Sequence, residues 1–122
     1  MRTTVVLVFA LAATGCARKS VKAQGPVVAE GRKTYAKFCV TCHGPEGSGY
    51  AADNSPSLRS PTFLSSATDA FLRAGITRGR PGTAMAAFAR DLGGPLGPAE
   101  VDAIIAYLRE GGPARRELPP AP

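Results

Sequence analysis

The sequence predicts an all-α domain of three main helices joined by long loops. Three segments place apolar residues at helical spacing. In addition, 14 glycines and 11 prolines make up about a fifth of the 122 residues, which favours turns and loops over a sheet. A chain of this length forms one domain with one core. Its single histidine excludes any site that needs two, such as a two-histidine zinc site.

The first fifteen residues predict an export signal. Met1-Arg2 supplies a positive start, and residues 5–13 are an apolar run too short to span a bilayer. Residues 13–16, Ala-Thr-Gly-Cys, resemble a bacterial lipobox, in which the cysteine becomes the first mature residue and carries lipid. We therefore expect Cys16 to anchor the protein on the periplasmic side of a bacterial membrane. The alternative is ordinary cleavage after the A-x-A sequence at residues 10–12, which leaves a soluble periplasmic protein.

Two polar segments flank the expected domain, which spans residues 27–112. Residues 16–26 are aperiodic and typical of a flexible tether, with an end-to-end distance of roughly 18 Å. Residues 113–122 are rich in proline and carry two adjacent arginines, which predicts a disordered tail.

The first helix is expected at about residues 28–40, and it leads into Cys39-Val40-Thr41-Cys42-His43. This C-x-x-C-H sequence is the attachment motif of c-type heme. Two thiols three positions apart lie along one face of a turn, so both reach the vinyl groups on one edge of the heme. The histidine then follows beneath the ring, with a nitrogen aimed at iron. The motif predicts one covalent heme c, with Cys39 and Cys42 as thioethers and His43 as an iron ligand.

Three other interpretations of the motif are weaker. A thioredoxin-like C-x-x-C expects a preceding strand, whereas the residues before Cys39 have a helical pattern. A zinc site needs four ligands, which the motif and the distant Cys16 barely supply. A disulfide between Cys39 and Cys42 leaves His43 without a role.

Two loops and a second helix follow the motif. Residues 44–61 form a long turn-rich segment, and long ordered loops are uncommon unless they serve a function such as wrapping a cofactor. The second helix is expected at about residues 66–78.

A Gly/Pro-rich loop then carries Met85, the only methionine left once Met1 leaves with the signal. Because the chain has no second histidine, Met85 is the predicted sixth iron ligand. A His/Met pair raises the heme potential, which favours electron transfer over dioxygen chemistry.

The third helix begins at Gly97-Pro98 and ends at Gly111-Gly112. Proline suits the first helical position. An apolar stripe at i, i+3, i+4 and i+7 predicts the face that packs in the core; its residues are Val101, Ile104, Ile105 and Leu108.

Residues 27–112 resemble a class I monoheme cytochrome c. Beyond the attachment motif, the resemblance rests on residues of the first helix, the last helix and both loops, namely Gly31, Tyr35, Ile104, Tyr107, Pro56, Leu58 and Met85. It implies the cytochrome c fold, with three main helices and long loops wrapped around one covalently bound heme. In that fold the first and last helices pack across each other at close range. The family often has proline directly after the methionine, where this chain has Ala86.

The resemblance also implies roles around the heme. The carbonyl of Pro56 would accept a hydrogen bond from the His43 ring, which fixes the imidazole and raises its basicity. Leu58 would touch the heme ring. Arg80 is expected either to meet a heme propionate or to be solvated.

The expected function is electron transfer rather than catalysis, because the one histidine is occupied and no pair of carboxylates frames a substrate site. One heme would shuttle an electron between membrane respiratory or photosynthetic complexes or periplasmic dehydrogenases. We expect redox proteins and a membrane as partners, no nucleic acid, and a monomer or a subunit of a larger complex. One alternative is a fixed heme subunit of a membrane redox complex. The other is a heme peroxidase or gas sensor, which needs an open sixth position.

Overall fold

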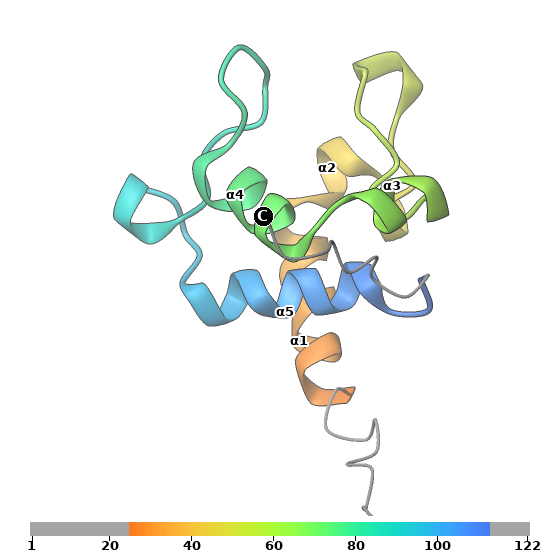
Figure 1. Cartoon of the computed structure of the whole chain (residues 1–122). Helices are drawn as coiled ribbons and strands as arrows, with labels where there is room; N and C mark the ends of the chain where they lie inside the picture. Colours follow the sequence, from red (N-terminus) through yellow and green to blue (C-terminus); the bar gives the residue numbers. More distant parts are fainter. Residues whose placement is uncertain (1–24, 113–122) are drawn as a thin grey trace, which may run out of the picture.

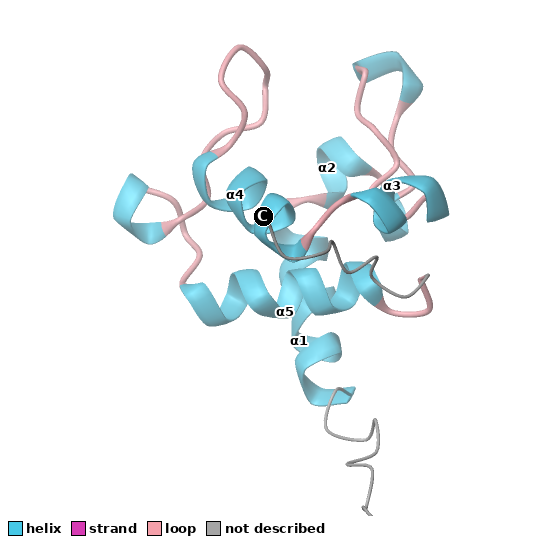
Figure 2. Ribbon diagram, in the orientation of Figure 1, coloured by secondary structure: helices cyan, strands magenta, loops and turns pink. Residues whose placement is uncertain are grey.

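The computed structural model describes residues 25–112, and within this range the domain is helical without strands (Figures 1 and 2). The α-helices are α1 (Gly25–Phe38), α2 (Val40–His43), α3 (Pro61–Ser66), α4 (Asp69–Arg78) and α5 (Pro98–Arg109). The 3₁₀ turns are η2 (Pro45–Gly47), η3 (Ala51–Asp53) and η4 (Arg90–Leu92). The all-α prediction is confirmed. The predicted signal peptide, Cys16, most of the tether and the tail lie outside the described residues.

Helices α1 and α5 cross at the base of the domain (Figure 1). At the crossing, Gly31 of α1 is buried against the backbone of α5. A Cβ atom on Gly31 would lie 1.9 Å from the carbonyl oxygen of Ala103, so only glycine allows this approach. The Tyr35 and Tyr107 rings meet beside it with their centroids 5.3 Å apart. The predicted close packing of the first and last helices is confirmed.

The core lies around this crossing. All four residues of the predicted apolar stripe on α5 are buried. They pack with Tyr107 of the same helix and with apolar side chains from α1, from α4, from the residue pair before α4 and from the segment after η4. These side chains are Val28, Tyr35, Ala67, Leu72 and Leu96. The C-terminal helix therefore supplies the largest share of the core.

The predicted second helix, residues 66–78, is wrong at its start. Helix α4 begins at Asp69 because the Thr68 hydroxyl caps it by accepting a hydrogen bond from the Phe71 N–H at 3.1 Å. A separate helix that the sequence analysis missed, α3, begins after Ser60, whose hydroxyl accepts from the Phe63 N–H at 3.1 Å. Two cap residues of the same type thus divide this part of the chain into two helices.

The first helix also differs from its expected bounds. It begins at Gly25, inside the predicted tether, and ends at Phe38. At Cys39 the backbone φ of −115° departs from helical geometry, and α2 follows as a separate turn. The attachment motif therefore lies on its own short turn rather than on the end of the long helix.

Arg109 joins the turn between α3 and α4 to α5. Its guanidinium donates hydrogen bonds to the carbonyls of Leu64 and Ala67 and pairs with the Asp69 carboxylate at 3.0 Å. The Arg109 side chain is only 16% exposed. This arginine therefore positions the start of α4, the helix that precedes the Met85 loop.

Candidate cofactor site

The attachment motif forms one helical turn. The N–H groups of Cys42 and His43 both donate to the carbonyl of Cys39, at 3.2 and 2.9 Å. Both thiols are free; Cys39 is half-buried and Cys42 is exposed. Burial, together with a smaller contribution from the neighbouring Cys42, raises the pKa of Cys39 to about 11. The two thiols are thus presented on one turn without bonding each other, and the helix before them differs from the strand that a thioredoxin-like motif expects.

His43 is half-buried and held through one side of its ring. Its Nδ1 lies 3.0 Å from the hydroxyl oxygen of Ser55. Burial lowers the pKa of His43, and a hydrogen bond with the backbone of Pro56 partly opposes this effect. The neutral imidazole is the form that binds a metal. Because Nδ1 is the nitrogen that faces Ser55, Nε2 lies on the side of the ring away from this contact.

Ser55 is a residue that the sequence analysis missed. The backbone of Pro56 is placed beside His43, as the resemblance implies, but the serine before it contributes the side-chain oxygen. The sequence feature that could have pointed to Ser55 is its position, as a hydroxyl residue directly before Pro56 in the loop. Because serine–proline pairs are common in ordinary turns, that signal alone did not point to the histidine.

The loop that carries these residues folds back on itself. The Leu58 N–H donates to the carbonyl of Gly47 at 2.8 Å, and the Tyr35 hydroxyl donates to the carbonyl of Gly44 at 2.9 Å. A Cβ atom on Gly49, whose φ is +79°, would lie 2.6 Å from the Ser55 carbonyl oxygen. The glycines of this segment therefore allow the tight return that brings the loop to the histidine.

Met85 lies half-buried in a closed loop after α4. Its carbonyl accepts from the Arg80 N–H at 2.9 Å, and its own N–H donates to the Thr83 hydroxyl oxygen at 3.2 Å. A Cβ atom on Gly79 would lie 2.5 Å from the Met85 carbonyl oxygen, so the two sides of the loop approach closely only because this residue is glycine. Main-chain bonds therefore fix the position of Met85 without a following proline.

Arg80 is exposed, and its guanidinium lies 4.8 Å from the centre of the Phe71 ring. Its backbone N–H closes the Met85 loop, as described above. This main-chain role of Arg80 was not predicted from the sequence, and it leaves open the two expected alternatives for its side chain, contact with a propionate or solvation.

Two loops project from the same side of the α1–α5 pair in Figure 1. One follows α4 and carries Met85, and the other carries η3 and leads to Pro56. In this view α2, with His43 at its end, lies between them. The segments that carry the predicted iron ligands therefore lie on the same side of the α1–α5 pair in this view.

The apolar side chains of this region fit a large flat cofactor. They pack against the core but remain partly open to solvent, and they come from the motif, both loops and the helices between them. The set is Phe38, Val40, Leu58, Phe63, Ile76 and Phe88. The rings of Phe38 and Phe88 lie 6.5 Å apart, which joins the residue before the motif to the segment after Met85. Such half-buried apolar groups are the surface that an apolar macrocycle covers.

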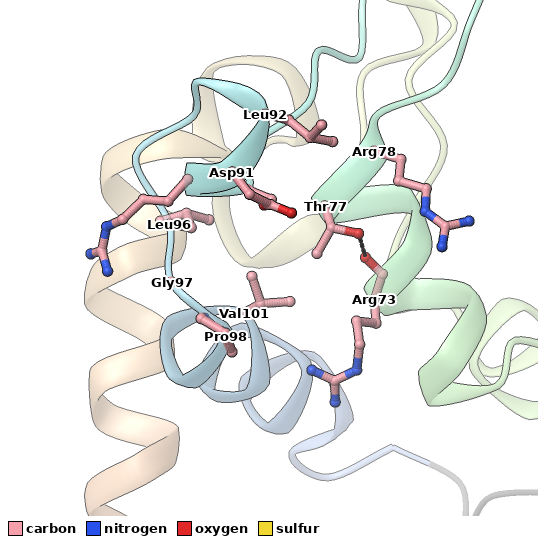
Figure 3. Close-up of a pocket in the computed structure, with 11 residues that line it drawn as sticks. Arg73, Thr77, Arg78, Asp91, Leu92, Leu96, Gly97, Pro98 and Val101 are labelled. Atoms are coloured by element: carbon pink, nitrogen blue, oxygen red, sulfur yellow. Dashed lines mark hydrogen bonds between the residues drawn. The ribbon is translucent and has the colours of Figure 1, made fainter.

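A pocket lies elsewhere, between α4, η4 and the start of α5 (Figure 3). Leu96 and Val101 form its apolar floor, and Leu92 stands at its edge with 55% of its surface exposed. The Thr77 hydroxyl on its α4 side donates to the carbonyl of Arg73 at 2.9 Å. This pocket contains none of the predicted site residues.

None of the helices within residues 25–112 has the length and apolar character needed to span a bilayer.

Comparison with known proteins identifies a family and several relatives. Residues 26–108 match the family described as "Cytochrome C oxidase, cbb3-type, subunit III". Among curated proteins, the dihydro-heme d1 dehydrogenase of Pseudomonas aeruginosa is 39% identical over 85 residues. That match covers 70% of this chain but only 16% of the relative. The chain therefore corresponds to a small part of that longer enzyme.

Solved structures similar to this chain include c-type cytochromes and the same dehydrogenase. The dihydro-heme d1 dehydrogenase NirN is 36% identical with a TM-score of 0.56, over 73% of this chain and 17% of NirN. The c-type cytochrome NirC is 27% identical with a TM-score of 0.51, over 71% of this chain and 93% of NirC. Cytochrome cL of Methylophaga aminisulfidivorans shares the fold, with 22% identity and a TM-score of 0.59, over 72% of this chain and 55% of that one.

Proposed function

The chain belongs to the c-type cytochrome family described as cytochrome c oxidase, cbb3-type, subunit III, and from that premise we propose that it is a one-electron carrier with His43 and Met85 as axial iron ligands. Membership of this family implies a covalently bound heme c and a part in heme-based electron transfer. Cys39 and Cys42 are the residues proposed to form the two thioether bonds. When bound, the heme supplies an iron that alternates between the ferric and ferrous states.

One observation supports the proposal most strongly: hydrogen bonds within the chain itself position both proposed iron ligands. Ser55 and Pro56 fix one side of the His43 imidazole and leave Nε2 for iron. The backbone of Arg80 and the Thr83 hydroxyl fix the main chain of Met85. Ligands that hold their positions in both oxidation states keep the reorganisation between those states small. Such a site suits electron transfer better than substrate turnover.

The chain's own residues favour a carrier over an enzyme. His43 is the only histidine, and the proposed iron ligation occupies it. If Met85 fills the sixth position, no position remains open for peroxide or a gas. We therefore propose that the protein has no catalytic residue of its own.

We also propose that the carrier is exported and held at a membrane by lipid on Cys16. The support is the lipobox-like sequence at residues 13–16 and the polar segment that follows it. Two or more acyl chains give stable anchoring where a single chain is marginal. The tether then lets the heme domain reach partners only close to the membrane surface.

A fixed subunit of a larger redox assembly is the second candidate. The specific observation is that this chain matches only 16% of the dihydro-heme d1 dehydrogenase, so there the same kind of domain forms part of a larger enzyme. The likeness to the dihydro-heme d1 dehydrogenase supports, for such an assembly, a partner that acts on a heme d1 compound. Copurification of partner proteins after mild detergent solubilisation supports a fixed subunit, whereas recovery of the protein alone supports a free shuttle.

Absorption spectroscopy of the purified holoprotein tests the axial ligands. We expect a low-spin ferric spectrum with a weak near-infrared sulfur-to-iron band. Met85→Leu keeps the shape of the side chain without the sulfur, and it should abolish this band and open the sixth position. Met85→His is the matched control, because it supplies another strong ligand and should restore a low-spin spectrum. A high-spin ferric spectrum in the unaltered protein would refute Met85 ligation and favour a peroxidase or sensor.

Mass spectrometry of the mature protein tests the covalent features. We expect one heme added to the peptide that contains Cys39 and Cys42, and acyl chains on an N-terminal Cys16. Cys16→Ser should remove the lipid mass and release the protein from membranes while the heme mass remains. A mature chain that begins at residue 13 with an unmodified Cys16 would contradict the lipid anchor but leave the carrier function intact.

A further inference from the structure

Arg59 connects the loop that holds His43 to the end of α5. The Arg59 side chain is half-buried, and its guanidinium donates a hydrogen bond to the carbonyl of Glu110, the C-cap residue that follows α5. The same guanidinium lies 5.2 Å from the centre of the Tyr107 ring. Among the hydrogen bonds of the described residues, this is the one that joins residues 44–60 to the end of α5.

The groups that receive Arg59 are themselves fixed. Tyr107 is 2% exposed, and the guanidinium of Arg32 from α1 also contacts its ring, at 5.1 Å from the centre. Arg32 also pairs with the carboxylate of Glu110 at 2.8 Å. A planar guanidinium both stacks on aromatic rings and donates in fixed directions. Arg59 therefore binds where α1 and α5 meet, against a buried ring and beside an exposed Arg32–Glu110 ion pair.

The other end of the loop is fastened to the same pair of helices. There the Tyr35 hydroxyl donates to the carbonyl of Gly44 at 2.9 Å. Ser55 and Pro56, the two residues that bond the imidazole, lie between these attachments. Tyr35 also forms a hydrogen bond with the backbone of Gly47 in the same loop. Beyond Gly47, the main-chain hydrogen bonds of the loop stay within it or reach His43, as in the bond from the Leu58 N–H to Gly47.

We propose that Arg59 is a positioning residue of the heme site, which holds the His43-bonding loop against the α1–α5 pair. The inference rests on the proposed function in one respect, that His43 is an iron ligand. If the Arg59 attachment is released, the loop around Ser55 and Pro56 moves more freely and admits water to the histidine side of the site. Water stabilises the ferric state, which carries the greater charge. Releasing the loop therefore lowers the reduction potential.

The charge of Arg59 is a competing explanation, because any cation near the heme disfavours the ferric state. Arg59→Lys separates the two effects. Lysine keeps the positive charge but has neither the planar fork nor the stacking surface of arginine. If positioning is what matters, Arg59→Lys and Arg59→Gln should behave alike.

The test measures two properties of the holoprotein in these variants, namely the midpoint potential and the exchange rate of the Leu58 amide hydrogen. We expect both variants to lower the potential and to speed Leu58 exchange at least tenfold. Arg32→Gln is the matched control, because it removes a guanidinium from the same ring and from Glu110 but lies outside the loop. Arg32→Gln should leave the midpoint potential and the Leu58 exchange rate close to those of the unaltered protein. This holds even if it lowers the melting temperature as much as the Arg59 variants do.

Three results would overturn the proposal. The first is unaltered Leu58 exchange in both Arg59 variants. The second is an unchanged potential in Arg59→Lys with a lowered one in Arg59→Gln, which assigns the effect to charge. The third is an Arg32→Gln variant that matches them in both readings, which assigns it to general stability. Failure of the His43/Met85 assignment appears separately, in the spectrum of the unaltered protein.

Discussion

The α1–α5 crossing and the two loops beside the heme site are stabilised in different ways. The crossing is an apolar contact in which Gly31 brings two backbones together and Tyr107 and Ile104 are almost fully buried. The loops are stabilised mainly by main-chain hydrogen bonds within themselves, and their apolar side chains are only half-buried. The crossing is built from the chain's own residues, whereas the loops present half-buried apolar side chains that a heme would cover. Stability and function are thus assigned to separate parts of one small domain.

Removing the heme should give the largest effect and should affect the loops first. In the double variant Cys39→Ala/Cys42→Ala we expect a loss of at least about 4 kcal/mol of stability, because a tightly held cofactor stabilises only the folded state. Hydrogen exchange should show residues 44–60 and 79–88 unprotected, with the last protected amides at the crossing. The single variant Cys42→Ala, which keeps one thioether, is the control. Protected loops in the double variant would mean that the two regions do not differ in this way.

The next largest effect should come from breaking the crossing itself. Gly31→Ala forces a Cβ atom to within 1.9 Å of a backbone oxygen, and we expect a loss of at least about 3 kcal/mol in the free energy of unfolding. Gly25→Ala, on the same helix, meets no atom within 4 Å and should be neutral or stabilise by up to about 1 kcal/mol. Denaturant unfolding of the two holoproteins measures the contrast. Equal stabilities would show that the helices can separate at no cost.

The same contrast explains what the sequence could predict. The apolar stripe of α5 and the small residue on α1 follow from periodicity and the family pattern, because packing at a helix crossing depends on which residues share a face. The attachment motif is equally local, and its five residues form one turn. The fold class and the crossing were therefore predictable, and the motif was found from its spacing alone.

The loops and helix starts were predicted less well because they depend on single hydrogen bonds. The start of α4 at Asp69 and the separate helix α3 depend on the caps Thr68 and Ser60, and nothing in the sequence distinguishes these caps from other serines and threonines. The contact of Ser55 with His43 and that of Arg59 with Tyr107 join residues that are 12 and 48 positions apart. No local pattern specifies which distant group such a side chain meets.

Arg109 and Arg73 both link α4 to α5, and we expect them to differ in how much they contribute to stability. Arg109 is mostly buried and donates to two main-chain carbonyls as well as to Asp69. Arg73 forms an ion pair with Asp102 in which both side chains are about half exposed. We expect Arg109→Met to cost about 2 kcal/mol of unfolding free energy, because it removes the donor from two half-buried carbonyls. Arg73→Met should cost under about 1 kcal/mol, as exposed ion pairs do. A thermal unfolding series at two salt concentrations checks both values, and equal losses would contradict the assignment.

The smallest expected effect concerns the hydroxyl that faces the histidine. With Nε2 on iron, as proposed, Nδ1 would keep its proton and donate to the Ser55 oxygen 3.0 Å away, which would make the imidazole a stronger donor to ferric iron. Ser55→Ala removes this acceptor but leaves the backbone of Pro56. We therefore expect the reduction potential to rise, by a change worth no more than about 1 kcal/mol.

The sign of that shift distinguishes the two effects on the loop. Removing the hydroxyl weakens the imidazole and raises the potential, whereas releasing the loop at Arg59 admits water and lowers it. Ser48→Ala is the matched control, because the Ser48 hydroxyl lies in the same loop and donates only to the Pro45 carbonyl, at 3.1 Å. It should leave the potential unchanged. A lowered potential in Ser55→Ala would mean that this serine holds the loop in place rather than acting on the electron density of the ligand.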